Sequence, residues 1–263
     1  MKKIFFTILV LGLCSMSINA QFGKIRLDKA VDAATKVAQS FTISDAEIAQ
    51  YADEYMEWLD ANNPVCRTTD EDEDMKAVAN RLANIVSIIP DNLIKELNLN
   101  ILSYYVVDVN AFACANGDIR MFAGLMDLMM DDEILAVIGH EIGHVANKDS
   151  KDAFVSALRI SALKDAAGAV GGNKAAKLTN SQLGDLAEAL GNAQYSQKQE
   201  NAADAYGYDF LVKCGKDPAN MASALGVLLK LQEDAGATGD SRFQNLFSSH
   251  PDLKSRIETL NKR

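Results

Sequence analysis

The feature that most constrains the fold is an apolar helical segment that carries two histidines and a glutamate. The segment begins at Asp131 and Asp132, is aliphatic at most later positions, and contains His140-Glu141-Ile142-Gly143-His144. Residues four apart lie one above the other on a helix, so both imidazoles point toward a shared position. Buried polar groups need partners. The sequence therefore predicts a buried helix whose two histidines share a ligand or a polar partner.

The spacing of the two histidines is typical of a metal site. Neutral imidazole nitrogens suit Zn²⁺, and two of them leave further coordination positions open. Glu141 follows the first histidine and is placed to act as a general base on a water molecule. The alternative is a pair of surface histidines on an ordinary helix. The chain has only three histidines, and aliphatic neighbours on the helix disfavour that alternative.

A catalytic zinc site needs a third protein ligand. A metzincin would carry a histidine six residues after His144, but residues 145–150 contain none. Glu200, in the later segment Gln199-Glu200-Asn201-Ala202-Ala203-Asp204, is the candidate that we choose. Ala202 and Ala203 would let its helix approach the histidine helix, and Asp204 could accept a hydrogen bond from a ligating histidine. Acids are common on helix surfaces, so spacing alone leaves other third ligands open.

Most of the remaining chain is predicted to be helical around one small sheet. A capping box at Ser44 precedes a helix that Pro64 ends, and five acids at 70–74 begin another helix. A calcium site at these acids is the alternative, but no EF-hand glycine follows. Strands are expected at 102–109, 111–115 and 119–123, with a turn at Asn116-Gly117. Further helices are expected at 153–163, 200–212 and 218–231, and Gly171-Gly172 is expected to interrupt the Ala- and Gly-rich stretch between the first two of them.

The first twenty residues have the order of a secretory signal peptide. Lys2 and Lys3 are followed by the apolar run 4–13 and then by Ala20 before Gln21. A run of this length is too short to span a bilayer, which takes about 20 residues. A buried N-terminal helix and a lipid anchor at Cys14 are the alternatives. We expect cleavage after Ala20, a periplasmic or secreted protein, and no transmembrane segment in the mature chain.

The net charge limits the kinds of binding partner that the chain can have, and the cysteine content limits its disulfides and redox sites. The net charge is −10, and removal of Lys2 and Lys3 would make it −12. Phosphate backbones repel such a chain, which argues against nucleic acid. Cys66, Cys114 and Cys214 would remain, none with Cys-x-x-Cys spacing, and whether two of them pair is open. Residues 21–263 are long enough for one sizeable core, and we expect a single domain.

Five separate segments resemble metallopeptidase family forty-eight, which includes HtpX, the CaaX prenyl protease and the exported LoiP- and BepA-like proteins. These segments occur in the family's order over about 150 residues, which makes the resemblance far more specific than the histidine motif alone. They are Asn110-Ala111-Phe112-Ala113, Gly124-Leu125-Met126, Gly139 to His144, Glu200-x-x-Ala203-Asp204-x-x-Gly207, and Ser249-His250-Pro251 with Arg256-Ile257.

The resemblance implies a mostly helical α+β fold of the zincin (gluzincin) type, with a small three-stranded sheet. It implies one zinc ion per chain, with Glu200 as the third ligand and Asp204 supporting a ligating histidine. It also implies that residues 110–113 form a strand beside the cleft, where an extended substrate could add as a further strand. A plain core strand is the alternative for these side chains. The expected activity is that of a zinc endopeptidase acting on unfolded or extended proteins, such as misfolded envelope proteins.

Several points stay open at this level. His250 could hydrogen-bond the oxyanion, cap the zinc as a fourth ligand, or make only a structural hydrogen bond. Many relatives carry a histidine where this chain has Asp149, and we do not expect a ligand there. Two other functions compete: a chaperone-like envelope assembly factor in which proteolysis is secondary, and a non-proteolytic zinc scaffold. Peripheral contact with the outer membrane, the natural substrate and the oligomeric state are not determined.

Overall fold

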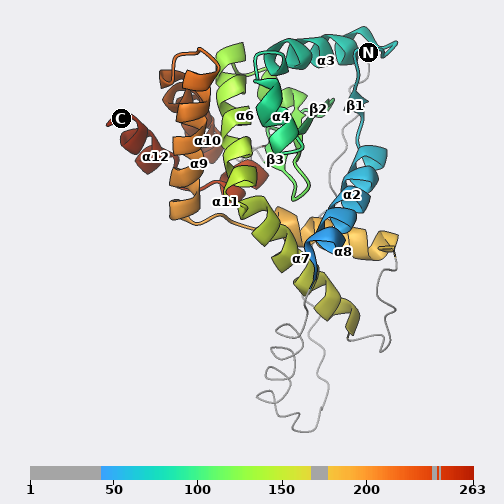
Figure 1. Cartoon of the computed structure of the whole chain (residues 1–263). Coiled ribbons are helices and arrows are strands. Elements are labelled where there is room, and N and C mark those ends of the chain that lie inside the picture. The colour runs from blue at the N-terminus through green and yellow to red at the C-terminus, as the bar shows by residue number, and fades with distance from the viewer. Residues whose placement is uncertain (1–42, 167–176, 239–241, 243) are drawn as a thin grey trace.

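The structure is a computed structural model, and it describes residues 43–166, 177–238, 242 and 244–263 (Figure 1). The expected signal peptide at 1–20 and the expected break at Gly171-Gly172 lie outside these residues. The described part is a mostly helical α+β fold with one small sheet, as the sequence predicts. None of its helices combines the length and the hydrophobicity that a membrane crossing requires.

The sheet is mixed and has four strands in the order β1-β2-β4-β3. Its middle pair, β2 and β4, is parallel, and both outer pairings are antiparallel. Three strands correspond to the predicted segments, and β1 is an addition, because two residues carry no recognisable alternation. The strands are β1 (Val65–Cys66), β2 (Asn100–Tyr104), β3 (Ala111–Ala113) and β4 (Asp118–Phe122).

The second strand is shorter than the sequence suggests. We expected it to reach Val109, but β2 ends at Tyr104, whose partner Phe122 is also the last residue of β4. The next amide, that of Tyr105, donates instead to the carbonyl of Pro64. The predicted turn lies at Asn116-Gly117, where Gly117 has a φ of 94°. A Cβ at Gly117 would lie 2.4 Å from a backbone oxygen, so only glycine fits.

The helices begin at the kinds of residue that the sequence marks. Ser44 and Glu47 form the predicted capping box, and Asp72 caps the helix after the acidic run. Three helices, α4, α8 and α11, were not predicted. The helices are α2 (Asp45–Asn62), α3 (Glu73–Val86), α4 (Asp91–Glu96), α5 (Ala123–Met126), α6 (Asp131–Ala146), α7 (Asp149–Ala166), α8 (Asn180–Gly191), α9 (Gln197–Lys213), α10 (Ala219–Thr238), α11 (Gln244–Ser249) and α12 (Leu253–Leu260).

The described residues bury two apolar clusters. The larger cluster joins one face of the sheet to α3, α6, α9, α10 and α12, and α6 runs through its middle (Figure 1). The smaller cluster joins α2, α7 and α8, with Tyr55, Phe154 and Leu186 among its buried members. Cys66, Cys114 and Cys214 carry free thiols. Strand β3 lies between the two clusters, because Ala111 belongs to the larger cluster and Phe112 packs against the smaller one.

Candidate metal centre

Helix α6 is buried on every side along most of its length. Residues 133–144 are all buried, so the histidines of the motif are core residues and not surface residues. Three acids in the first turn suit the positive end of the helix dipole. The carboxylate of Glu133 accepts the amide of Met130 at 2.9 Å and the hydroxyl of Ser223 at 2.6 Å. These bonds fix the start of α6 against α10, and thereby the position of the histidine motif along the helix axis relative to α10.

Helix α9 approaches α6 closely because small residues line the contact. A Cβ added to Gly143 would lie 2.9 Å from the Cα of Ala203, and one added to Gly207 would lie 3.2 Å from the amide nitrogen of His140. Ala203 lies in this contact, as predicted. The expectation for Ala202 is wrong, because its side chain is exposed on the outer face of α9. Glycines on both helices provide the rest of the close approach.

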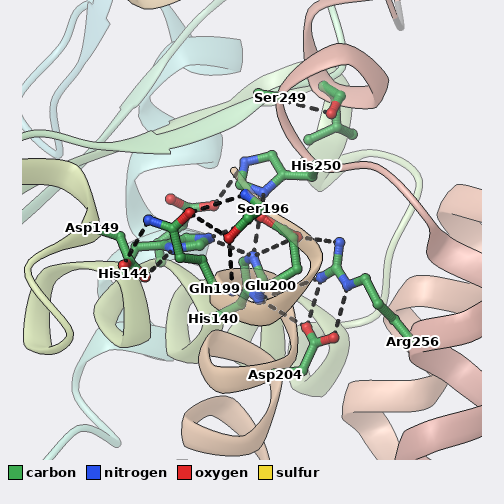
Figure 2. A network of polar contacts seen from close by, with 12 residues as sticks. His140, His144, Asp149, Ser196, Gln199, Glu200, Asp204, Ser249, His250 and Arg256 are labelled. Atoms are coloured by element: carbon green, nitrogen blue, oxygen red, sulfur yellow. Dashed lines mark hydrogen bonds and ion pairs between the residues drawn. The ribbon is translucent and has the colours of Figure 1, made fainter. Parts of the chain in front are cut away.

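Four side chains from three segments of the chain converge between these helices (Figure 2). Their ligand atoms all lie within 4.8 Å of one another. The Nε2 atoms of His140 and His144 are 3.1 Å apart, and the carboxylate of Glu200 lies 3.7 Å and 3.4 Å from them. His250 adds its Nδ1 at 3.4 Å from the Nε2 of His140 and 3.0 Å from Glu200. The sequence offered His250 several roles, and the structure places it within the cluster.

These distances fit one tetrahedral metal ion. Zinc bound at about 2.0–2.1 Å to nitrogen and oxygen places neighbouring ligand atoms of a tetrahedron about 3.3 Å apart. The spacings of 3.0–3.7 Å between the four side chains lie around that value. Three imidazoles and one carboxylate are also a donor set that first-row transition metals prefer. The cluster is therefore a metal-site candidate formed by described residues.

The first histidine is held from behind by a buried ion-pair network. Asp204, one turn after Glu200 on α9, lies 2.9 Å from the Nδ1 of His140. Arg256 of α12 donates to both carboxylate oxygens of Asp204, at 2.7 and 2.6 Å, and forms an ion pair with Glu200. The sequence suggested Asp204 for this place. It gave Arg256 no role, because α12 is more than fifty positions away in the chain.

The second histidine has partners that the sequence did not suggest. Its Nδ1 lies 3.0 Å from Asp149, the first residue of α7, and Gln199 donates to the other oxygen of that carboxylate. The ring of Tyr195 stacks on the imidazole with centroids 3.9 Å apart and planes at 15°. Asp149 was expected not to be a ligand, and it contacts the far nitrogen of the ring and not the cluster itself. No local pattern marks Asp149 or Tyr195, and the capping box that contains Gln199 does not indicate its contact with Asp149.

The charged neighbours set the pKa values within the cluster. Burial lowers the pKa of His140, although Asp204 opposes the shift. Burial also acts to lower the pKa of His144, but Asp149 and Glu200 outweigh it and raise that pKa to about 9. Burial raises the pKa of Asp204, yet Arg256 and His140 reverse the effect and hold it at about 2. In the same way the surrounding histidines keep the pKa of Glu200 far below its usual range, so a carboxylate faces the imidazoles.

Glu141 and the strand β3 border the cluster. The carboxylate of Glu141 lies 3.8 Å from the Nε2 of His250 and is 2% exposed. Strand β3 is an outer strand of the sheet and packs against α6. The amide of Phe122 donates to the carbonyl of Asn110, so the backbone groups of Ala111 and Ala113 point away from β4. The side-chain oxygen of Asn110 accepts one of them, the amide of Ala111.

Comparisons with known proteins agree with this geometry. The sequence model of Peptidase family M48 matches residues 70–263. The chain is 38% identical to Metalloprotease LoiP of Escherichia coli over 86% of this chain and 83% of that protein. It is 34% identical to Metalloprotease YcaL of the same organism, over 91% and 88% of the two chains. A Protease HtpX homolog of Salinibacter ruber is 30% identical over 57% of this chain and 63% of that protein.

Proposed function

The chain belongs to Peptidase family M48 and is a metalloprotease, and from this premise we propose that it is a zinc-dependent endopeptidase. We assign His140, His144 and Glu200 as the metal ligands and Glu141 as the general base. One observation carries the proposal, namely the convergence of two imidazoles from α6 and one carboxylate from α9 within 3.1–3.7 Å of one another. Zinc is the metal that this donor set and spacing suit best.

The residues divide the work of hydrolysis. A bound zinc ion supplies Lewis acidity, which makes a water molecule acidic and polarises a carbonyl group. Glu141 takes the proton from the attacking water and returns it to the leaving amine. Its position directly after His140 on α6 keeps the carboxylate beside the cluster. Asp204 keeps the proton of His140 on Nδ1 and leaves the lone pair of Nε2 for the metal.

We assign His250 as a fourth ligand in a closed conformation. Its Nδ1 points toward Glu200 and His140, and its ring is 6% exposed. The capping role among the sequence-based alternatives accounts for these contacts, and a capping ligand would leave the fourth position when water and substrate enter the site. A His250→Ala variant should therefore keep zinc on three ligands and cleave casein faster than the wild type. A fall in kcat of about 10²–10³-fold with unchanged KM would favour the oxyanion role.

We propose that substrate adds to the open edge of β3. The backbone of Ala111 and Ala113 faces away from β4, and the strand packs against α6. An extended peptide hydrogen-bonded along this edge would lie across the metal helix. Binding of this kind requires an unfolded or extended chain, which supports misfolded proteins as substrates. The inward side chain of Phe112 contributes to the smaller apolar cluster, so its role is structural.

We further propose that residues 1–20 are removed on export, that residues 21–263 form a single domain, and that the mature protein acts in the periplasm or outside the cell. The basic, apolar and small-residue order of this segment supports the proposal. N-terminal sequencing of the mature protein should begin at Gln21. A mature chain that begins at a lipid-modified Cys14 would contradict this cleavage site and support a membrane anchor.

The proposed activity is tested with Glu141→Gln. This variant should bind one zinc ion per chain as the wild type does and should cleave casein about 10²–10⁴-fold more slowly. Zinc content by elemental analysis and casein cleavage by gel assay measure the two effects on the same preparation. Undiminished cleavage would remove Glu141 from the mechanism. Full complementation of a deletion strain by this variant would instead favour the chaperone-like function.

A further inference from the structure

The imidazole of His144 has a hydrogen-bonding partner on the side opposite the metal cluster. Its Nδ1 lies 3.0 Å from an oxygen of Asp149, while its Nε2 faces Glu200 at 3.4 Å. The histidine is fully buried and Asp149 is 7% exposed. Since a carboxylate can only accept, the proton of the neutral ring must lie on Nδ1 for this bond to form. The bond therefore directs the lone pair of Nε2 toward the cluster.

The backbone places this carboxylate with little freedom. Helix α6 ends at Ala146, and Lys148 takes a positive φ of 65°, which turns the chain into α7 within two residues. Asp149 is then the first residue of α7 and points back at His144. Helix α7 is anchored in turn by the smaller apolar cluster, through residues such as Phe154. The turn between the two helices therefore fixes the carboxylate at the histidine.

The other oxygen of Asp149 is also occupied. Gln199 donates to it at 3.0 Å, and Gln199 directly precedes the proposed ligand Glu200 on α9 (Figure 2). The amide oxygen of Gln199 accepts the backbone amide of Ser196 in the capping box that begins α9. One chain of hydrogen bonds thus runs from the start of α9 through Asp149 to His144. It links the helix that carries the carboxylate to the helix that carries the imidazoles.

We propose that Asp149 is a positioning residue of the metal centre, which acts through His144 and is itself held by Gln199. It plays for the second histidine the part that Asp204 plays for the first. An acceptor behind a ligating imidazole fixes its tautomer and orientation and makes it a stronger ligand, and loss of such a partner typically weakens metal binding by about 10–100-fold. The inference rests on the proposed zinc site and extends it to a residue of a third helix.

The test compares Asp149→Ala, Asp149→Asn and the control Asp152→Ala in the full chain. Asp152 is an exposed acid one turn along α7, so its removal changes the net charge equally without touching His144. Three quantities are measured for each protein. They are the zinc affinity, by competition with a chelator, the visible spectrum with Co²⁺ in place of zinc, and the melting temperature of the metal-free protein. A purely structural role of Asp149 would move only the last quantity.

We expect Asp149→Ala to weaken zinc binding by about 10–100-fold and to alter the Co²⁺ bands. Asp149→Asn keeps an accepting oxygen but loses the charge, so its affinity should lie between that of Asp149→Ala and the wild type. Asp152→Ala should match the wild type in affinity and spectrum. If Asp149→Ala does not fold, the zinc affinity and the Co²⁺ spectrum of Asp149→Asn test the proposal in its place.

Wild-type affinity and spectrum in the folded Asp149 variants would overturn the inference while leaving the zinc site intact. A wild type that binds neither Zn²⁺ nor Co²⁺ would overturn the proposed function itself, and this inference with it. The two failures are distinct, because the first appears only in the variants and the second already in the unmodified chain.

Discussion

The two apolar clusters of the molecule differ in how much buried charge they contain. The larger cluster surrounds His140, His144, Glu200, Asp204 and Arg256, all buried, and each of them contacts another member of the set. The smaller cluster of α2, α7 and α8 is built from apolar side chains such as Tyr55, Phe154 and Leu186. Its stability should therefore follow from packing, whereas that of the metal helices should depend on charges that balance one another. The comparison predicts which substitutions the metal ion can compensate.

The largest difference should appear at Arg256. Replacement by Met would leave the carboxylates of Glu200 and Asp204 buried without their guanidinium partner, which should cost the metal-free protein about 3–5 kcal/mol. Bound zinc should recover part of this loss, since it supplies positive charge next to Glu200. Unfolding in urea, with and without zinc, measures both quantities. Arg256→Lys, which keeps the charge but not the forked geometry, should lose less.

The matched change in the smaller cluster is Leu186→Ala. Leu186 is fully buried in α8, so the substitution should cost about 2–5 kcal/mol through lost burial and a cavity. Zinc should not alter that cost, because no charge has changed near the metal. Equal recovery of Arg256→Met and Leu186→Ala by zinc would contradict the distinction between the two clusters.

A smaller loss of stability is expected when Asp60 is replaced, at the border between the smaller cluster and the sheet. Asp60 of α2 pairs with the buried Arg120 of β4 at 2.9 Å and accepts the hydroxyl of Tyr104. Burial alone would raise the pKa of Asp60, but these donors hold it below its usual value. A depressed pKa stabilises the fold above the unfolded value of about 4, and this stability is lost as the pH falls through the folded value.

Asp60→Asn should therefore cost about 1.5–3 kcal/mol at neutral pH, the size of hydrogen bonds to a charged group. The gap between the variant and the wild type should begin to narrow as the pH falls below about 4, where the Asp60 carboxyl of the unfolded chain becomes protonated, and should narrow further as the pH falls through the lower pKa of the folded protein. Urea unfolding at a series of pH values measures the gap. A gap that stays constant down to the lowest measurable pH would show that the charge of Asp60 does not contribute.

The smallest effects should come from two glycine substitutions of opposite sign. A Cβ at Gly143 would press on the backbone of Ala203, so Gly143→Ala should push α6 and α9 apart and cost about 1–3 kcal/mol. Gly184 in α8 has no atom within 4 Å of an added Cβ, so Gly184→Ala should stabilise the protein by up to about 1 kcal/mol. Thermal unfolding compares them. Gly143→Ala should also weaken zinc binding, whereas a variant with wild-type affinity would show that helix separation does not set the site.

The sequence predicts the parts of this site that lie within one helix or within a known motif. Residues four apart place His140 and His144 on one face of α6, because the helix repeat is local. Glu200 and Asp204 lie on a different helix, and only the ordered set of family motifs selects them from other acids. The capping box at Ser44 and the turn at Gly117 are likewise local signals.

The parts that escaped prediction depend on contacts between distant segments. Asp149 acts through the packing of α7 against α6, Tyr195 through the turn before α9, and Arg256 through the packing of α12 against α9. No short-range pattern in the sequence indicates that packing. Strand β1 has only two residues, and its pairing with β2 follows from tertiary structure. Helix α8 lies in a segment rich in Ala and Gly, where its capping box at Thr179 was the available signal.

The most direct test of the account is an anomalous diffraction map recorded at the zinc absorption edge from crystals of the full chain. The account predicts one peak per chain, within about 2.0–2.2 Å of the Nε2 atoms of His140 and His144 and of a carboxylate oxygen of Glu200. A crystal grown with zinc that shows no peak between α6 and α9, or a peak that is not bound by these three residues, would contradict it.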